Sequence, residues 1–381
     1  MRVLLAGLST RAAAESAARA GFEVIAIDAF GDRDQHPAVR SLSITRDLGG
    51  RPTAASMARA ARSISCDAVA YLSPFENHPR AVATLASGRA LLGNPPEVLR
   101  RVRDPRLLAE AFRRHGLAAP MVRIHTNDPN DANAWVIKPR ASGGGQRVRP
   151  WRPTLARLPR GSYLQEFVEG IPGSVVFLSG AGRSVPLGIT RQLLGDPAFG
   201  ASGFQYCGSI LASAGPVGAE RLAAAVTVEF GLVGLNVIDF VAHDGAPYAI
   251  EVNPRWSGSM ELVERVVGVS LFALHTAACL DGEPPPVSLG WGRPPRGVVL
   301  GKAIVFARRD VVVGDTQRWL ADSTVRDVPQ PGERIAAGRP VCTVFAEGRD
   351  ESACRLALAS QAAEIYRDLD HVSRFEGQFD P

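Results

Sequence analysis

One stretch decides the fold of this chain: Asn236-Val-Ile-Asp239-Phe-Val-Ala-His-Asp-Gly245-Ala-Pro-Tyr-Ala-Ile-Glu251-Val-Asn253-Pro-Arg255. Two apolar runs flank the turn sequence His-Asp-Gly, so the stretch predicts a β-hairpin with one carboxylate on each strand. Side chains alternate between the faces of a strand, so Glu251, Asn253 and Arg255 project from the same face. Hairpin pairing is expected to bring Asp239 beside them.

The acids in this hairpin indicate a metal site. A carboxylate among apolar neighbours is costly unless it is paired or bound to a metal. Two carboxylates and an amide oxygen form a hard ligand set that suits Mg²⁺, with Mn²⁺ as an alternative, bridging the phosphates of a nucleotide. We therefore expect Asp239, Glu251 and Asn253 to bind the metal, and Arg255 to stabilise a developing oxyanion. The alternative is a salt-bridged hairpin in which Arg255 neutralises the acids.

A lysine followed by glycines precedes the hairpin, in the segment Ala134-Trp-Val-Ile-Lys138-Pro-Arg-Ala-Ser142-Gly-Gly-Gly145. Polyphosphate needs a fixed positive charge and free backbone N–H groups, and this segment supplies both. The lysine precedes the glycines, so the segment is not a Walker A motif. Of the 43 basic side chains only Lys138 and Lys302 are lysines, which favours a role specific to lysine at these positions. The alternative is a flexible loop beside an incidental lysine.

A third segment lies between these two: Tyr163-Leu-Gln165-Glu166-Phe167-Val168-Glu169-Gly170. Its apolar and acidic residues alternate, as in an ordinary edge strand. As a nucleotide hinge, the same segment would offer backbone N–H and C=O groups to the edge of an adenine ring.

The N-terminal third predicts a parallel sheet. A strand over 2–6, a helix over 11–20 and a strand over 24–27 that ends at Asp28 form a βαβ unit. The turn after the first strand holds one glycine rather than GxGxxG, which disfavours a dinucleotide site. A strand over 68–72 leads into a loop with Glu76 and Asn77, and such loops bind ligands in open α/β sheets. We expect these two residues to contact substrate, with a solvated or capping role as the alternative.

Later elements divide the chain. A helix is predicted over 107–115, strands over 298–307 and 341–345, and a helix over 351–369. We expect three domains: a Rossmann-like domain over 1–100, a nucleotide- and metal-binding domain over 101–285, and a β-rich domain over 286–381.

Composition excludes several classes of protein. The net charge of +5 is spread without a basic stripe, so neither nucleic acid nor a membrane is expected as a partner, and an anionic small molecule is. The first residues do not form a signal peptide, and no apolar run is long enough for a membrane helix. The five cysteines are scattered, which fits a reducing compartment. We expect a soluble cytoplasmic protein.

These segments, in this order and spacing, resemble the ATP-grasp superfamily over nearly the whole chain. Four sequence motifs are most similar to those of its predicted ATP-dependent carboligases: Gln-Glu-Phe-Val-Glu-Gly, Thr-Arg-Gln, Phe-x-Tyr-x-Gly and Glu-Val-Asn-Pro-Arg. Some of these are encoded with enzymes of one-carbon cofactor (tetrahydromethanopterin and methylofuran) biosynthesis, and a related group includes tyramine–glutamate ligase. The resemblance implies an α/β and α+β fold: a pre-ATP-grasp domain, an ATP-grasp module and a small C-terminal barrel as in biotin carboxylase.

The resemblance also implies roles for individual residues. Nucleotide-binding roles fall on Lys138, Ser142, Gly143, Gly144, Gly145, Gln165, Glu166, Phe167, Val168, Glu169 and Glu251. Metal-binding roles fall on Asp239, Glu251 and Asn253. The family's earlier ATP-contacting lysine is absent, which leaves Arg103 or Arg106 as a substitute, and we assign the role to Arg106. The family's ribose-binding acid is also absent, and Glu169 is the nearest replacement.

The implied activity is ligation of a carboxylate to an amine. ATP phosphorylates the carboxylate, and the amine then displaces phosphate from the acylphosphate. Arg255, Lys138 and Arg191 are the expected catalytic residues, and Glu76, Asn77, Gln192, Tyr206 and Arg255 the expected substrate contacts. A homodimer is a further expectation. An ATP-grasp kinase or carboxylase, or an ATP-binding protein without catalysis, remain the alternatives.

Overall fold

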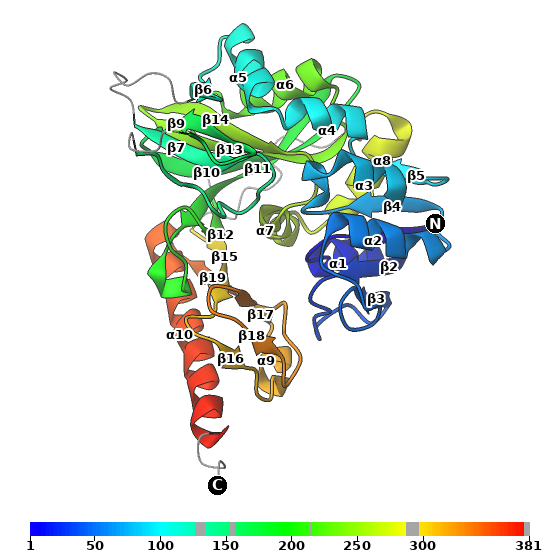
Figure 1. Ribbon diagram of the computed structural model, residues 1–381, viewed down its shortest axis with the longest axis vertical. Helices are drawn as coiled ribbons and strands as arrows, with labels where there is room; N and C mark the ends of the chain where they lie inside the picture. The colour runs from blue at the N-terminus through cyan, green and yellow to red at the C-terminus, as the bar shows by residue number, and fades with distance from the viewer. Residues whose placement is uncertain (126–133, 153–156, 213–214, 287–296, 377–381) are drawn as a thin grey trace.

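The computed structural model describes residues 1–125, 134–152, 157–212, 215–286 and 297–376, with side chains as far as Asp370. These residues form a five-stranded parallel sheet, a four-stranded and an eight-stranded antiparallel sheet, and a two-stranded ribbon (Figure 1). The predicted fold class, α/β combined with α+β, is confirmed.

The N-terminal sheet has the strand order β3-β2-β1-β4-β5, and all neighbours run parallel. Its strands are β1 (Arg2–Ala6), β2 (Glu23–Asp28), β3 (Val39–Ser43), β4 (Ala68–Tyr71) and β5 (Ala90–Leu92). The helices α1 (Arg11–Arg19), α2 (Ala54–Ala60) and α3 (Pro79–Leu85) and the 3-10 turns η1 (Ala61–Ser63) and η2 (Phe75–Asn77) connect them. The central strands are apolar on both sides because helices cover both faces of a parallel sheet. The predicted βαβ unit is confirmed.

Two helices and a small sheet follow. Helix α4 (Pro96–Val102) is followed by α5 (Pro105–Arg114), whose N-cap Asp104 accepts hydrogen bonds from the backbone N–H groups of Arg106 and Leu107. The four-stranded sheet has the order β6-β9-β7-β8. Its strands are β6 (Val122–Arg123), β7 (Trp135–Pro139), β8 (Arg149–Pro150) and β9 (Ser162–Glu166).

The largest sheet joins the middle of the chain to its C-terminal part, in the order β14-β13-β10-β11-β12-β15-β19-β17. Its strands are β10 (Ile171–Gly180), β11 (Arg183–Leu194), β12 (Tyr206–Leu211), β13 (Gly234–His243), β14 (Ala246–Asn253), β15 (Val299–Phe306), β17 (Val325–Arg326) and β19 (Pro340–Gly348). Because β15 pairs with β12, the segment after residue 285 extends the sheet of the preceding segment. The remaining elements are η3 (Pro197–Phe199), α9 (Gln317–Ala321) and the ribbon of β16 (Val311–Val312) and β18 (Arg334–Ile335).

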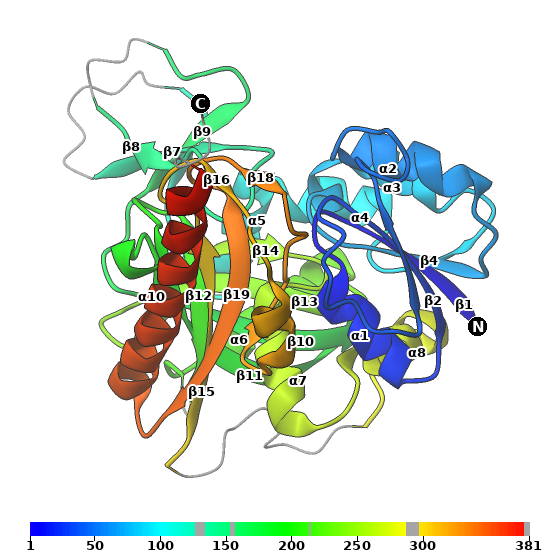
Figure 2. The ribbon, with the colours of Figure 1, turned by 90° about the horizontal axis from the view of Figure 1, so that it is seen from below.

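Helices pack on both faces of the large sheet. Helix α6 (Ala219–Phe230) lies against β10, β11 and α5, and α8 (Leu271–Asp281) against β10, β13 and α1. Helix α7 (Gly258–Val267) lies against β12, and α10 (Glu351–Glu376) runs alongside β15 and β19 (Figure 2). One apolar core includes Val3 and Leu5 of the N-terminal sheet together with Leu178 of β10, Met260 of α7 and Phe272 of α8. The N-terminal domain is therefore packed firmly onto the rest of the chain.

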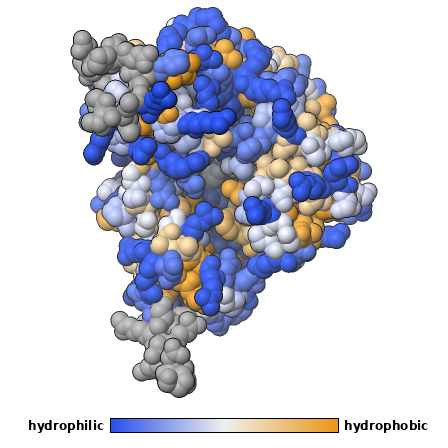
Figure 3. Space-filling view, in the orientation of Figure 1, coloured by the Kyte–Doolittle hydropathy of each residue, from blue (hydrophilic) through white to orange (hydrophobic). Residues whose placement is uncertain are grey.

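The surface seen in Figure 3 is mostly hydrophilic, with hydrophobic side chains in scattered patches. Among the described residues no single helix is long and apolar enough to cross a membrane, although α7 and α8 taken together, with a bend of 105° between them, reach the necessary length and composition.

His275 of α8 links the two main sheets. The backbone N–H of Leu235 in β13 donates to Nδ1 of His275 at 2.9 Å, and Nε2 lies 3.2 Å from the carbonyl oxygen of Leu92 in β5. Because Nδ1 accepts a hydrogen bond, the ring proton is on Nε2, and the imidazole is neutral. Burial lowers the pKa of His275 to about 4.

This geometry predicts a pH dependence of stability. The folded pKa lies below the ordinary value of 6.5, so the unfolded chain takes up a proton first as the pH falls. The free energy of unfolding is expected to decrease between about pH 6.5 and pH 4, by up to roughly 3 kcal/mol from this group. Urea denaturation at a series of pH values measures the slope. His275→Gln should flatten the slope, whereas His78→Gln, at an exposed position, should retain it. An identical slope in wild type and His275→Gln would contradict the assignment.

Candidate functional site

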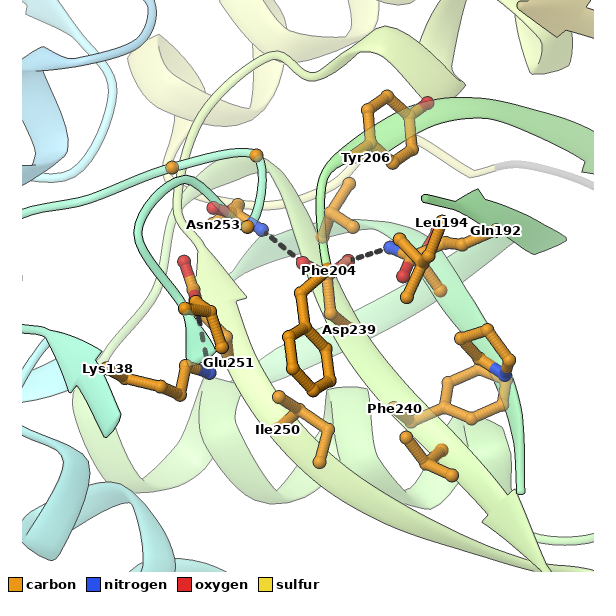
Figure 4. A pocket seen from close by; sticks show the side chains of 18 of the residues that line it. Lys138, Gln192, Leu194, Phe204, Tyr206, Asp239, Phe240, Ile250, Glu251 and Asn253 are labelled. Atoms are coloured by element: carbon orange, nitrogen blue, oxygen red, sulfur yellow. Dashed lines mark hydrogen bonds and ion pairs between the residues drawn. The ribbon is translucent and has the colours of Figure 1, made fainter. Parts of the chain in front are cut away.

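The site is built around the predicted hairpin, which is formed by β13 and β14. Asp239 lies directly opposite Glu251 in the strand register, and the register shifts immediately after Asp239. The amide nitrogen of Asn253 donates to Oδ2 of Asp239 at 2.8 Å. The three expected metal ligands therefore lie together, as Figure 4 shows.

Two neighbouring carboxylates give this site its electrostatic character. Burial, together with the negative charge of Glu251, raises the pKa of Asp239 to about 7. Burial also acts to raise the pKa of Glu251, but the positive charges of Arg103 and Lys138 outweigh it and lower that pKa. Among the described residues Asp239 forms no ion pair, although Arg255 and Lys138 lie near enough to act on it, and an added cation would be attracted to it.

Lys138 reaches the hairpin from β7. Its Nζ donates to Oε1 of Gln165 at 3.1 Å and lies 3.7 Å from Oε2 of Glu251. Gln165, on the neighbouring strand β9, in turn donates to the carbonyl oxygen of Ile250 in β14 at 3.2 Å. Lys138 is 7% exposed, so its charge is held at one place beside the carboxylates.

The glycine loop after β7 borders the same cavity. The carbonyl oxygen of Ser142 accepts from Nδ2 of Asn77 and Nη2 of Arg103, each at 3.4 Å. The N–H of Tyr206 donates to the carbonyl oxygen of Gly144 at 3.0 Å. Gly145 has a φ of +70°, and a Cβ there would lie 1.8 Å from the carbonyl oxygen of Phe204, so only glycine fits this close approach.

The predicted hinge forms another wall. Residues 165–169 all line the cavity. The carboxylate of Glu166 accepts from the N–H of Met121 at 2.9 Å, which fixes the end of β9. The exposed ring of Phe167 meets the ring of Phe204 edge to face, with centroids 6.1 Å apart. This wall of the cavity therefore combines the backbone of the hinge with aromatic side chains.

Arg255 projects into the cavity from the chain after β14. Its Nη2 donates to Oε1 of Glu76 at 2.8 Å and to Oδ1 of Asn253 at 3.2 Å. Glu76 is fully buried and does not line the cavity, because it lies behind the guanidinium group. Asn77 lies behind Arg103 in the same way, accepting from that guanidinium at 2.9 Å. These two predicted substrate contacts therefore hold arginines in place.

Of the two arginines that could substitute for the missing lysine, Arg103 contacts Glu251, although it does not line the cavity itself. Its Nη1 donates to Oε1 of Glu251 at 2.6 Å and to the carbonyl oxygen of Val252 at 2.9 Å. Arg106 does not reach the cavity. It stands on the exposed first turn of α5 and lies 3.6 Å from the carboxylate of Asp104.

The predicted pair Arg191 and Gln192 is split between the two faces of β11. Gln192 lines the cavity, and its Nε2 donates to Oδ1 of Asp239 at 2.7 Å. Arg191 is exposed and pairs with Glu351 at 2.8 Å, because neighbouring side chains on a strand point to opposite faces. Arg191 is therefore not at the cavity, contrary to expectation.

The cavity has a volume of about 540 Å³, which is large enough for a nucleotide-sized ligand. Tyr206 lines it, as expected. Sequence reasoning missed other lining residues, among them Ser174, Leu194, Phe204, Ser209, Ser257, Gly258 and Ser259. Single serines and apolar residues in loops and strands carry no pattern that would have marked them.

The ligand set fits a hard divalent cation. Asp239, Glu251 and the amide oxygen of Asn253 are oxygen donors of the kind Mg²⁺ prefers. In the part of the chain that the structure describes, no three His, Cys, Asp or Glu side chains gather as a metal-binding group. A cation here would use the two carboxylates and complete its shell with water or oxygens of a ligand, and the amide of Asn253 would join after turning its oxygen from Arg255 toward Asp239.

Comparisons with known proteins agree with this geometry. Residues 102–259 match the model of an ATP-grasp domain, a range that spans α5, the small sheet, the glycine loop and the hairpin. An uncharacterized protein from Methanocaldococcus jannaschii is 26% identical over 124 residues, which cover 32% of this chain and 28% of that protein. This chain thus matches less than a third of the length of that relative.

Two solved structures share the fold over almost the whole chain. An L-amino acid ligase from Bacillus licheniformis is similar with a TM-score of 0.67 and 17% identity, covering 97% of each chain. The biotin carboxylase domain of a 2-oxoglutarate carboxylase from Hydrogenobacter thermophilus, crystallised with MgADP, ADP and bicarbonate, has a TM-score of 0.65 and 16% identity. That alignment covers 90% of this chain and 85% of the domain. At such identities the likeness establishes a common fold.

The buried pair of Glu76 and Arg255 yields a prediction about stability. Glu76→Gln removes the carboxylate and leaves a largely buried guanidinium without its counter-charge, which costs roughly 3 kcal/mol of unfolding free energy. Urea denaturation near neutral pH measures this loss. Glu97→Gln makes the same chemical change at an exposed position and should alter the free energy by less than about 0.5 kcal/mol. Equal effects of the two substitutions would mean that the buried pair contributes nothing.

Proposed function

We propose that this chain, which carries an ATP-grasp domain over residues 102–259, is an ATP- and Mg²⁺-dependent ligase that joins a carboxylate to an amine. One observation carries the proposal. A single cavity collects a fixed lysine, a glycine loop, an apolar hinge and two opposed carboxylates. A magnesium nucleotide needs these features together: an apolar site for the base, groups that donate hydrogen bonds to the phosphates, and a site for a divalent cation.

In this proposal the adenine ring lies between the hinge and Phe204, and the phosphates lie beside Lys138 and the glycine loop. Asp239, Glu251 and Asn253 would hold Mg²⁺, which neutralises charge on the phosphate oxygens when bound. The carboxylase domain solved with MgADP supports such a complex for this fold. Arg103, held by Asn77, does not line the cavity itself and would act on the nucleotide site by holding Glu251 in place.

The reaction follows from this arrangement. The substrate carboxylate attacks the γ-phosphorus of ATP, ADP leaves, and an acylphosphate forms. The amine then attacks the carbonyl carbon, loses a proton and displaces phosphate, leaving an amide. Arg255 lies beside Asn253, where it can hold the acylphosphate and the oxyanion of the tetrahedral intermediate. The contact between Gly144 and Tyr206 covers the phosphate end and limits the entry of water.

Two other functions use the same site. A kinase would transfer the phosphoryl group to a hydroxyl, and a carboxylase would activate bicarbonate, the anion that was crystallised with the 2-oxoglutarate carboxylase domain. The ligase is favoured because the motif sequences resemble those of carboligases. An amino acid ligase also shares the fold along 97% of this chain. A role in one-carbon cofactor biosynthesis and a homodimeric state are parts of the proposal that rest on the sequence resemblance.

Product analysis tests the ligase. ADP and phosphate should form from ATP and Mg²⁺ only when both a carboxylate and an amine are supplied, and a panel of amino acids, pterins and furans would reveal the pair. Glu251→Gln should lower the rate by about 100-fold or more, because it removes a metal ligand. Glu347→Gln, at an exposed position, is the matched control and should keep the wild-type rate. ATP binding without ADP formation under any condition would instead indicate a non-catalytic ATP-binding protein.

A comparison of two nearby arginines tests the nucleotide site. Arg103→Met should weaken ATP binding roughly tenfold to a hundredfold, because Glu251, an expected metal ligand, loses the charge-assisted hydrogen bond that holds it in place. Arg106→Met removes the same charge three residues away, on the exposed side of α5, and should leave ATP affinity unchanged. Calorimetric titration with a non-hydrolysable ATP analogue and Mg²⁺ measures both. The opposite order of effects would reassign the contact to Arg106.

A further inference from the structure

The small sheet that carries Lys138 belongs to the segment in which the excess positive charge of the protein lies. Residues 132–165 include seven of the 43 basic side chains and none of the 38 acidic ones. The rest of the chain therefore has slightly more acidic than basic side chains, and the net charge of +5 originates in this one segment. The charge is thus not evenly spread, contrary to the expectation from composition.

Apart from Lys138, these basic residues are all exposed arginines, which we call the arginine surface: Arg140, Arg147, Arg149, Arg152, Arg157 and Arg160. Arg140 lies 3.9 Å from the carboxylate of Asp104. Within the ranges that the structure describes, the other five form no ion pair and no side-chain hydrogen bond. Since neighbouring guanidinium groups repel one another, this concentration of charge adds nothing to the stability of the fold.

The arginine surface flanks the glycine loop. Arg140 stands two residues before the loop formed by residues 142–145, and Arg147 stands two residues after it. Val148, the next residue, lines the cavity. The arginine surface therefore begins at the wall of the cavity.

Strand pairing brings the two ends of the arginine surface to the same strand. Arg149 of β8 lies opposite Ile137 of β7. At the end of β7, the backbone N–H of Arg140 donates to the carbonyl oxygen of Gly161 at 2.8 Å, next to Arg160. The charges are thus gathered around the strand from which the lysine of the cavity projects.

A nucleotide carries the opposite charge. A surface of one sign beside a cleft raises the local concentration of an oppositely charged ligand, and such steering increases association rates roughly 10-fold to 1,000-fold. The attraction extends over the Debye length, which is about 10 Å at 0.1 M salt, so the arginines need not contact the nucleotide. The position of the arginine surface beside the cavity is the one that steering requires.

We propose that the arginine surface attracts the nucleotide from solution and steers its phosphates toward Lys138 and the glycine loop. The inference rests on the ATP binding of the proposed function and adds the residues that set the rate of association. An acidic macromolecule is another partner that arginines attract. The nucleotide is favoured because the arginine surface is continuous with the loop that borders the cavity. A solvated surface without a partner is the remaining alternative.

Association kinetics test the steering. Stopped-flow mixing of the full chain with a fluorescent, non-hydrolysable ATP analogue and Mg²⁺ measures the association and dissociation rate constants separately. The association rate constant should fall about tenfold or more when salt is raised from about 0.01 M to about 1 M, because the Debye length shortens from about 30 Å to about 3 Å. An AMP analogue with the same fluorophore carries fewer charges and should show a weaker salt dependence.

Two triple variants separate charge from contact. Arg147→Gln, Arg149→Gln and Arg152→Gln, combined in one chain, should lower the association rate constant at low salt roughly threefold to tenfold and leave the dissociation rate constant unchanged. The same three arginines changed to lysine keep the charge and should retain the wild-type rate. All three positions are exposed, so the free energy of unfolding should change by less than about 0.5 kcal/mol per substitution.

A third variant controls for the net charge of the protein. Arg51→Gln, Arg59→Gln and Arg62→Gln remove an equal charge from exposed positions in and around α2. Helix α2 lies far from β7 and β9 in both ribbon views (Figure 1, Figure 2). This variant should therefore associate with the ATP analogue at nearly the wild-type rate.

Each result decides between the alternatives. A wild-type association rate in the glutamine variant at positions 147, 149 and 152 would overturn the steering and leave the arginine surface to another partner or to solvent. A lysine variant as slow as the glutamine variant, or an equal decrease in the α2 variant, would also overturn it. If the analogue does not bind at any salt concentration, the nucleotide site of the proposed function fails as well, which is a different result from binding at an unchanged rate.

Discussion

The repulsion between Asp239 and Glu251 is the interaction on which the site depends. Strand pairing places these acids directly opposite each other, partly buried, and the pKa of Asp239 is raised to about 7 as a result. Such an arrangement is stable only if cations surround it. Lys138 from β7 and Arg103 from the end of α4 approach Glu251, and Arg255 approaches through Asn253. The remaining deficit of positive charge lies at Asp239, which is where a divalent cation with its nucleotide would bind.

The rest of the fold delivers and holds these cations. The N-terminal domain contributes no residue to the wall of the cavity among those described, yet its loop after β4 supplies Glu76 behind Arg255 and Asn77 behind Arg103. The C-terminal segment continues the large sheet through β15, where Lys302 lies opposite Ser209, a residue that lines the cavity. Glu261 then connects Lys302 with Arg11 of α1. Buried ion pairs therefore connect the N-terminal and C-terminal parts of the chain with the middle part, which supplies the residues that line the cavity.

Backbone contacts also hold the glycine loop at one side of the cavity. The glycine loop approaches residues 204–206 so closely that a side chain at Gly145 would collide with the carbonyl group of Phe204. The loop thus needs glycine for this contact as well as for its free N–H groups. Since the glycine loop, Phe204 and Tyr206 all line the cavity, this contact forms one side of it.

Local sequence determined the elements and the hairpin. Alternation with a period of two placed Glu251, Asn253 and Arg255 on one face, and a turn sequence predicted their pairing with the strand of Asp239. Tertiary structure decided which of two neighbours faces the cavity. Gln192 rather than Arg191 does so because the sheet has two faces, and the sequence of β11 does not say which is covered. Arg103 rather than Arg106 contacts Glu251 because α5 begins at Pro105 and turns the next residues toward solvent. The sequence marked Glu76 as a candidate site residue. Its burial behind Arg255 depends on how two sheets pack together, and contacts between residues far apart in the chain set that packing.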